Sequence, residues 1–167
     1  MEEKDIAEIS LVVNQAYEGS DDSGAVGWTH EKELIAPPRI PVHLKNPKEF
    51  VVTSDMNVFK FQENGKILGC VRVERHGTSA DVSMLSVVPS LQARGVGSTL
   101  LKAAEDWARG KGCQTMEMAV VCHRKELQDY YKRRGYKETE KTIPFPIREG
   151  YGAPIIPLHF IVFEKTL

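Results

Sequence analysis

The sequence is poor in cysteine and lacks any long apolar segment. It contains only Cys70, Cys113 and Cys122, an odd number without a Cys-x-x-Cys pair, which excludes a disulfide framework. Free thiols are typical of a cytoplasmic protein, and we predict that location. The apolar runs are far too short to cross a bilayer, and the polar start over 1–5 argues against a signal or transit peptide. We therefore expect no membrane partner.

An excess of charge of one sign is missing as well. The chain carries 22 Lys and Arg against 23 Asp and Glu, so its formal net charge of −1 predicts no nucleic-acid partner. The five His and three Cys show no metal-ligand spacing, and we predict no metal site. Cys122 and His123 are adjacent, but successive residues of an extended segment point to opposite faces. That geometry argues against a nucleophile–base pair.

Length and composition indicate one globular domain over 1–167. Of the 167 residues, 41% are apolar and 27% are charged, which is ordinary for such a domain. Apolar residues at helical spacing predict a first helix near 6–17, with Asp5 as its N-cap. Residues 18–49 are rich in Gly, Ser, Asp and Pro and form a long excursion, with a short helix over 29–35. A loop of that length in a compact domain usually has a function.

The apolar pattern after residue 49 predicts a sheet interrupted by two helices, with Asn64-Gly65 as a hairpin turn. In chain order we expect three antiparallel strands (50–62, 67–75, 81–88), a helix (around 100–108), a strand (115–121), a helix (around 127–131) and two strands (136–143, 157–164). This order indicates a mixed α/β (α+β) domain.

Residues 87–98 form the most informative segment. An apolar run ends at Pro89, Gly95 and Gly97 follow, and a helical pattern opens at Ser98. Glycines let the backbone turn and approach a ligand closely, and free N–H groups at a helix N-terminus favour a phosphate. Gln92 and Arg94 add polar side chains to the same turn. The segment therefore predicts a pyrophosphate site.

Two common nucleotide motifs do not fit this turn. A dinucleotide fold would require a third glycine where Leu100 stands, and Glu117 lies within a strand rather than at its end. No Gly-Lys-Ser/Thr follows, so a P-loop is excluded. The segment resembles instead the acyl-CoA loop of the GNAT superfamily of N-acyltransferases, Gln/Arg-x-x-Gly-x-Gly/Ala. Residues 92–97, Gln-Ala-Arg-Gly-Val-Gly, match every fixed position.

A second block supports the resemblance. Residues 126–136 are similar to the later helix of this family, which ends in an aromatic-Tyr-x-x-x-Gly-aromatic signature. The family resemblance implies a mixed, mostly antiparallel sheet with helices on both faces. The family usually has a strand before the first helix, and only four residues precede Asp5. Without that strand the next one is an exposed edge, which can pair with a second copy of the chain in a homodimer.

The resemblance also implies the co-substrate, acetyl-CoA, and the residues that hold it. Main-chain groups of 85–88 would pair with the pantetheine arm, and the N–H groups of 94–98 would bind the pyrophosphate. The family often has an Asn at position 124, and the Arg found here would face a CoA phosphate. The predicted binding residues are Leu85, Val87, Val88, Gln92, Arg94, Gly95, Val96, Gly97, Ser98 and Arg124.

Two residues are the candidates for chemistry. By resemblance, Tyr131 protonates the leaving thiolate, the alternative being a core aromatic residue; Tyr130 is the expected core residue of the pair. The resemblance also implies Asp81 as the candidate base, because histone-type members of the family carry an acidic residue at this position. Alternation puts Asp81, Ser83 and Leu85 on one face of a strand, which is compatible with that role. A solvated carboxylate at a strand end is the simpler account of Asp81. Its rivals as the base are His30, Glu31, Glu74 and Glu117.

We therefore expect an N-acetyltransferase that moves the acetyl group of acetyl-CoA directly to a primary amine in a ternary complex. Residues 27–31 and Phe145-Pro146 would shape the pocket of a small-molecule acceptor. A peptide acceptor, either a lysine or an N-terminus, stays open. So do two other classes, a sensor that binds acyl-CoA without turnover and a nucleotide-dependent oxidoreductase.

Overall fold

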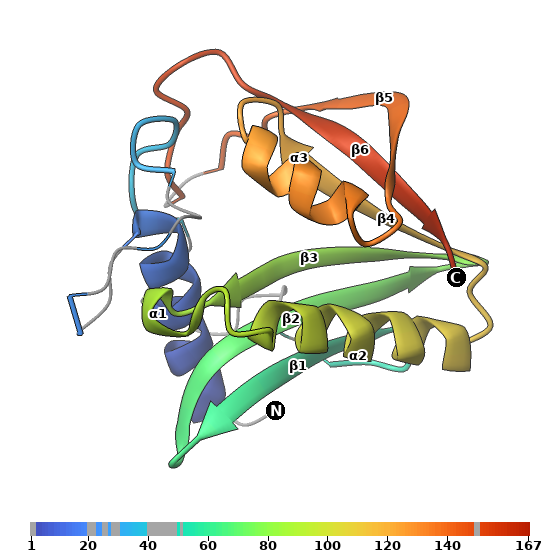
Figure 1. Cartoon of the computed structure of the whole chain (residues 1–167), viewed down its shortest axis with the longest axis horizontal. Coiled ribbons are helices and arrows are strands. Elements are labelled where there is room, and N and C mark those ends of the chain that lie inside the picture. Colours follow the sequence, from blue (N-terminus) through green and yellow to red (C-terminus); the bar gives the residue numbers. More distant parts are fainter. Residues whose placement is uncertain are drawn as a thin grey trace.

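The computed structural model describes residues 3–19, 23–24, 27, 31–39, 50, 52–148 and 151–167. Three helices and six strands follow one another in the predicted order (Figure 1). The helices are α1 (Glu3–Glu18), α2 (Val96–Gly110) and α3 (Lys125–Lys132), with a short 3-10 turn, η2 (Pro89–Leu91), before α2. The strands are β1 (Met56–Glu63), β2 (Lys66–His76), β3 (Ser79–Val87), β4 (Thr115–Val121), β5 (Lys137–Pro144) and β6 (His159–Thr166).

The six strands form one sheet in the order β1-β2-β3-β4-β6-β5, and every neighbouring pair except β3–β4 is antiparallel. This confirms the predicted mixed, mostly antiparallel sheet. In this order β1 has β2 as its one neighbour, so β1 is an edge of the sheet. Within the described part of the chain, no helix is long and apolar enough to span a membrane.

Helices cover both faces of the sheet, also as predicted. Val58 packs with the cluster under α1, whereas its neighbour Phe59 packs with the cluster under α2. Because successive strand residues point to opposite faces, α1 and α2 lie on opposite sides. Leu127 and Tyr131 of α3 pack into the α2 cluster, so α2 and α3 share a face.

Three local predictions were wrong. The first strand begins at Met56 rather than at residue 50, and Phe50 is instead a buried residue of the α1-side cluster. Asp5 does not cap α1, which starts at Glu3; its buried carboxylate pairs with Lys60 at 2.9 Å. The described part of the predicted helix over 29–35 is a single turn, with the Leu34 N–H donating to the Glu31 carbonyl at 2.9 Å.

The central feature of the sheet is a split between β3 and β4. These strands pair in parallel over only three residues, from Ser79–Thr115 to Asp81–Glu117. Beyond that point they diverge, and Figure 1 shows the gap opening from the shared end towards α1. On the β2 side, β3 carries a bulge between Ser83 and Ser86, where Met84 has a φ of 53°. A bulge bends a strand and increases its twist, which accounts for the departure of β3 from β4.

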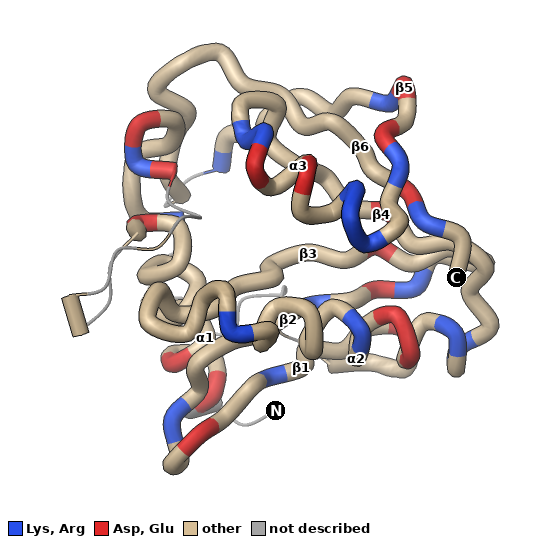
Figure 2. Tube along the Cα trace, in the orientation of Figure 1, with Lys and Arg blue, Asp and Glu red and all other residues tan. Residues whose placement is uncertain are grey.

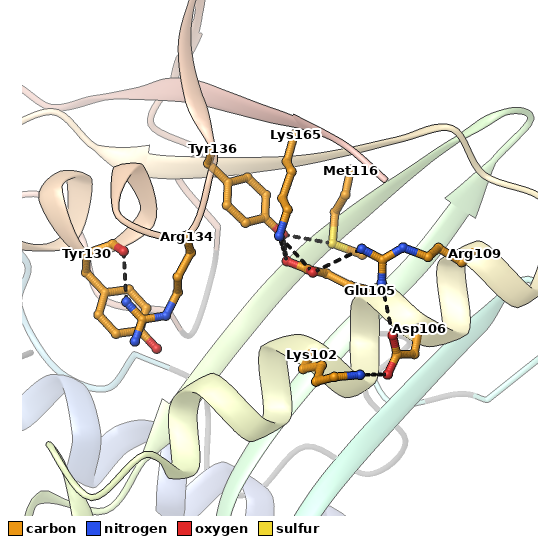
Figure 3. Close-up of polar contacts among 9 residues, drawn as sticks. All are labelled: Lys102, Glu105, Asp106, Arg109, Met116, Tyr130, Arg134, Tyr136 and Lys165. Atoms are coloured by element: carbon orange, nitrogen blue, oxygen red, sulfur yellow. Dashed lines mark hydrogen bonds and ion pairs between the residues drawn. The ribbon is translucent and has the colours of Figure 1, made fainter.

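A buried ionic cluster fastens α2 to the second half of the sheet (Figure 3). Glu105 of α2 is 6% exposed, and the Lys165 ammonium of β6 donates to both of its carboxylate oxygens at 2.9 Å. The Tyr136 hydroxyl donates to the same carboxylate at 3.0 Å. The Tyr136 ring then packs edge-on against Tyr131, with centroids 6.0 Å apart. The cluster therefore fixes the end of α3 relative to α2.

Removing the charge of Lys165 should destabilise the fold. Lys165→Met leaves the buried Glu105 carboxylate with Arg109, at 3.5 Å, as its one cationic partner among the described residues. Breaking a buried pair from one side is costly, so we expect a loss of about 2–3 kcal/mol in the free energy of unfolding, measured by urea denaturation. The control is Lys102→Met, which removes a surface pair with Asp106 and should change stability little, because the Lys102 side chain is 73% exposed. Equal effects of the two variants would contradict a structural role for Glu105–Lys165.

Candidate active site

The turn before α2 presents unused backbone donors. Ala93 and Gly95 have φ values of 62° and 86°, and this backbone leads directly into α2 at Val96. The N–H groups of Val96, Gly97 and Ser98 donate to no other residue that the structure describes, whereas the Thr99 N–H already donates to the Gly95 carbonyl at 3.0 Å. No acidic residue lies in the first turn. Three aligned donors at a helix N-terminus, without an acidic residue in the first turn, form a site for a phosphate group.

Basic side chains from the end of α3 face this turn. The Arg134 guanidinium donates to the Ser98 hydroxyl and to the Tyr130 carbonyl at 2.9 Å, and it stacks over the Tyr130 ring with 3.4 Å from Cζ to the centroid. Figure 3 shows this stacking, and Figure 2 shows the basic segment after α3 on the side of α3 that faces α2. Arg133 adds a second positive charge to the same surface. Arg134 thus combines with the helix N-terminus to favour an anion.

Between α2 and α3 lies a cavity of about 490 Å³, which we call the α2–α3 cavity. Seven of the predicted site residues line it: Leu85, Val87, Gln92, Gly95, Gly97, Ser98 and Tyr131. The Gln92 amide donates to the Val87 carbonyl at 3.0 Å and lies against Gly27. Gln92 therefore also stabilises the turn between β3 and α2.

Tyr131 occupies the inner part of the α2–α3 cavity. Its ring packs against the core and lies edge-on to Tyr130, with centroids 5.2 Å apart. The hydroxyl donates to no other described residue. Burial raises the pKa of Tyr131, and the neighbouring Tyr17 raises it further. The phenol is therefore protonated at neutral pH and free to donate a hydrogen bond to a ligand. Tyr130, the expected core residue, lines the cavity as well.

A second cavity, of about 430 Å³, lies on the α1 side of the sheet, and we call it the α1-face cavity. Its floor is formed by β3, β4 and β6, and includes Asp81 and Glu117. Its roof includes Phe145, Pro146 and Tyr151 from the β5–β6 loop and Arg39 from the excursion. The predicted contribution of Phe145 and Pro146 to a pocket is consistent with this placement. Trp28, Thr29 and His30 of the predicted acceptor segment lie outside the described residues.

Tyr17 of α1 joins the two cavities, because its side chain lines both. Burial raises the pKa of its phenol, and the nearby Glu31 raises it further. The sequence places Tyr17 on the apolar stripe of a helix, where it is indistinguishable from a core residue. Only the split between β3 and β4 brings α1 close to α3, and no local pattern signals that contact.

The bulge in β3 also corrects a predicted alignment. Alternation along the strand predicts Asp81, Ser83 and Leu85 on one face. In the structure Asp81 and Ser83 line the α1-face cavity, whereas Leu85 lines the α2–α3 cavity. The extra residue of the bulge shifts the alternation by one, which turns Leu85 to the other face. One strand therefore contributes side chains to both cavities.

Asp81 lies at the closed end of the split, beside Glu117. Its carboxylate is 3.5 Å from the His76 ring and its side chain is 53% exposed. Partial burial raises the pKa of Asp81, as do the nearby carboxylates of Glu117 and Glu74, whereas His76 lowers it. A raised pKa makes the carboxylate a stronger base, but Asp81 and Tyr131 line different cavities.

Four predicted binding residues lie outside the lining of the α2–α3 cavity. Val88 and Val96 are buried in the two apolar clusters, and Arg94 is exposed on the outer side of the turn. The Arg124 guanidinium is 3% exposed and pairs with Glu126 at 2.7 Å and with Glu31 at 3.5 Å. Because carboxylates surround it, Arg124 links the excursion to α3 and does not face the cavity.

Cys122 and His123 do approach each other, contrary to the prediction from an extended segment. The Cys122 sulfur is 3.1 Å from His123 Nδ1, because both residues lie in the turn after β4 and not in the strand itself. Neither residue lines either cavity. The pair therefore has no place in the site described above.

Comparison with known proteins finds relatives that are named N-acetyltransferases. The chain is similar to the uncharacterised N-acetyltransferase YhfO of Bacillus subtilis, with 31% identity over 85 residues that cover 46% of this chain and 56% of that protein. The chain spans about half the length of the curated relatives it matches.

Two solved structures share the fold. The ribosomal-protein-S18-alanine N-acetyltransferase of Escherichia coli has a TM-score of 0.67 at 16% identity, covering 99% of this chain and 90% of that one. A GNAT acetyltransferase of Elizabethkingia anophelis with acetyl-CoA bound has a TM-score of 0.56 at 17% identity, covering 68% of this chain and 78% of that one. A model of the Acetyltransferase (GNAT) family matches residues 27–136, which include the turn before α2 and all of α3. The chain belongs to the GNAT acetyltransferase family.

Proposed function

We propose that this protein is an N-acetyltransferase that transfers the acetyl group of acetyl-CoA to a primary amine of a small molecule, by direct attack in a ternary complex. The observation that carries this proposal is the pair of cavities that meet at Tyr17 across the split sheet. One cavity has the donors for a pyrophosphate and the other has carboxylates for an amine. Two substrates can therefore approach from opposite faces and react in the split.

The α2–α3 cavity is the site for acetyl-CoA. The N–H groups at the start of α2, with Arg134, would bind the pyrophosphate. The pantetheine arm would then run past Leu85 and Val87 into the split, where β3 and β4 leave their facing backbone groups unpaired. This arrangement brings the thioester to Tyr131 and Tyr17. A CoA-binding relative of known structure supports this interpretation through its fold.

In the reaction, the amine nitrogen bonds to the acetyl carbon, and the carbon–sulfur bond then breaks. The nitrogen loses a proton to a base and the thiolate of CoA gains one, which leaves an amide and free CoA. Tyr131 is the donor to the thiolate, because its hydroxyl is protonated and has no other described partner. Asp81 is the candidate base, directly or through water, since its pKa is raised and it lines the other cavity.

A methyl group at Gly97 should weaken CoA binding, because it would narrow the α2–α3 cavity. A Cβ at Gly97 would lie 3.1 Å from the Tyr130 hydroxyl, inside the α2–α3 cavity. We expect Gly97→Ala to raise the dissociation constant of CoA roughly tenfold, a loss of about 1.4 kcal/mol measured by calorimetry. Gly110→Ala is the matched control at the other end of α2, where a Cβ meets nothing within 4 Å. Unchanged CoA affinity in Gly97→Ala would place the cofactor elsewhere.

Removing the Tyr131 hydroxyl should slow turnover without weakening CoA binding. The ring of Tyr131→Phe keeps its packing, but the donor to the leaving thiolate is lost. We expect kcat to fall about 100-fold or more, measured as acetyl-CoA-dependent thiol release with an amine accepted by the wild type. The dissociation constant of CoA should stay within about threefold of the wild-type value. Wild-type protein that binds CoA but acetylates no amine would favour a sensor instead.

The rate should rise with pH through the pKa of Asp81. A base acts only when ionised, so kcat/KM should increase as pH rises through the raised pKa and then level off. Asp81→Asn should lower kcat/KM and remove that acidic limb. If Asp81→Asn instead keeps the wild-type pH profile, the base is another group, with Glu117 the nearest carboxylate on the facing strand.

A further inference from the structure

We propose that the acceptor carries an anionic group, a carboxylate or a phosphate, in addition to its amine, and that Arg39 binds that group at the roof of the α1-face cavity. The inference rests on the proposed function, because it names the class of acceptor for the same site. Its basis is the distribution of charge within this cavity, acidic at the closed end of the split and basic at the roof.

Arg39 has the environment of a ligand-binding guanidinium. It lies 4.9 Å from the centroid of the Tyr17 ring and 5.6 Å from that of Phe145, and its side chain is 21% exposed. Its one charged partner among the described residues is Glu31, at 3.7 Å, which is too far for a hydrogen bond. Two aromatic rings thus hold the guanidinium in place while its N–H donors make no hydrogen bond within the described part of the chain. Such a group is preorganised for a bidentate anion.

Glu31 leaves the hydrogen-bond donors of Arg39 unused. Its buried carboxylate, which is 4% exposed, lies 3.5 Å from the Arg124 guanidinium and 3.7 Å from that of Arg39. Arg124 has a closer partner in Glu126, at 2.7 Å, so these four side chains balance in charge. An anionic ligand would give Arg39 a partner at hydrogen-bond distance on the cavity side.

The floor of the cavity has the opposite character. Asp81 and Glu117 are register partners on β3 and β4, and both line the cavity. Two further arginines line the cavity. Arg72 pairs with Glu74 and donates to the Ser83 hydroxyl at 3.4 Å, and Arg148 lies over the Tyr151 ring, 5.8 Å from its centroid, on the side of the roof. Glu117 already pairs with the Lys141 ammonium at 2.9 Å, so Asp81 is the carboxylate of the floor that an ammonium or amine would meet, close to the point where the strands separate.

The size of the cavity is consistent with one small molecule that spans from floor to roof. Its volume of about 430 Å³ lies in the range of small-ligand sites. A peptide would present its neighbouring backbone as a neutral amide, which gives Arg39 no anion. The charges at the two ends of the cavity therefore favour a small amine with a negatively charged tail.

The wild-type protein provides the first test, through matched acceptors. Thiol release from acetyl-CoA would be compared for β-alanine and phosphoethanolamine, which carry the anion, and for propylamine and ethanolamine, which lack it. We expect kcat/KM to be about 30-fold or more higher for at least one anionic acceptor than for its neutral counterpart. The comparison of β-alanine with propylamine tests for a carboxylate, and the comparison of phosphoethanolamine with ethanolamine tests for a phosphate. Equal or better turnover of the neutral amines overturns the proposal, whereas turnover of no amine at all contradicts the enzyme assignment itself.

Variants of Arg39 provide the second test. Arg39→Met should lower kcat/KM for the preferred anionic acceptor about 30-fold or more and change the value for its neutral counterpart less than threefold. Arg39→Lys should restore part of the preference, because the charge returns without the bidentate geometry. Arg75→Met is the matched control, since Arg75 pairs with Asp55 outside both cavities. Equal losses for anionic and neutral acceptors in Arg39→Met, with unchanged CoA affinity, would show that Arg39 has only a structural role.

Discussion

The short parallel pairing between β3 and β4 is the constraint on which the rest of the structure depends. Three residue pairs hold the two halves of the sheet together, and beyond them the strands separate. A parallel sheet normally continues its pairing, so beyond the split the backbone groups of β3 and β4 that face each other have no strand partner on that side. These groups can pair with an extended ligand in place of a strand. The bulge at Met84 makes the separation possible, and it also directs the side chains of one strand into both cavities.

A split of this kind needs support from elsewhere, because the sheet itself no longer fixes the relative positions of its halves. That support comes from α2 and the segment after α3. The Glu105–Lys165 pair joins α2 to β6, and Arg134 joins the end of α3 to Ser98 at the start of α2. Both contacts use charged groups that are at least partly buried, where an ion pair is directional and costly to break from one side. These contacts therefore fix the position of α2, and of the turn before it, relative to α3 and β6.

The sequence was sufficient for the parts of the fold that have local signals. The order of helices and strands, the turn at 92–97 and the tyrosine of α3 all follow from periodicity, glycine placement and family motifs within short windows. The features that the sequence did not predict depend on contacts between distant segments of the chain. Tyr17 looks like one more residue of an apolar stripe, and nothing near Arg124 indicates that Glu31, far away in the chain, lies 3.5 Å from its guanidinium. The bulge was missed for a related reason, because one inserted residue leaves no trace in an alternating pattern.

The two cavities differ in how they are built, and this difference bears on specificity. The α2–α3 cavity is formed by a helix N-terminus and the turn before it, whose backbone donors suit the pyrophosphate that we propose they bind, a feature that every acyl-CoA shares. The roof of the α1-face cavity is formed by the excursion and the β5–β6 loop. They contact each other through backbone hydrogen bonds, from the Ala36 N–H to the Ala153 carbonyl at 2.9 Å and from the Gly152 N–H to the Pro38 carbonyl at 2.7 Å. Loops joined in this way can change their side chains without disturbing the split beneath them. The choice of acceptor can therefore change independently of the machinery for the donor. Arg39 lies in one of these loops and contacts two aromatic rings. A substitution of Arg39 is therefore the kind of change that would alter the choice of acceptor.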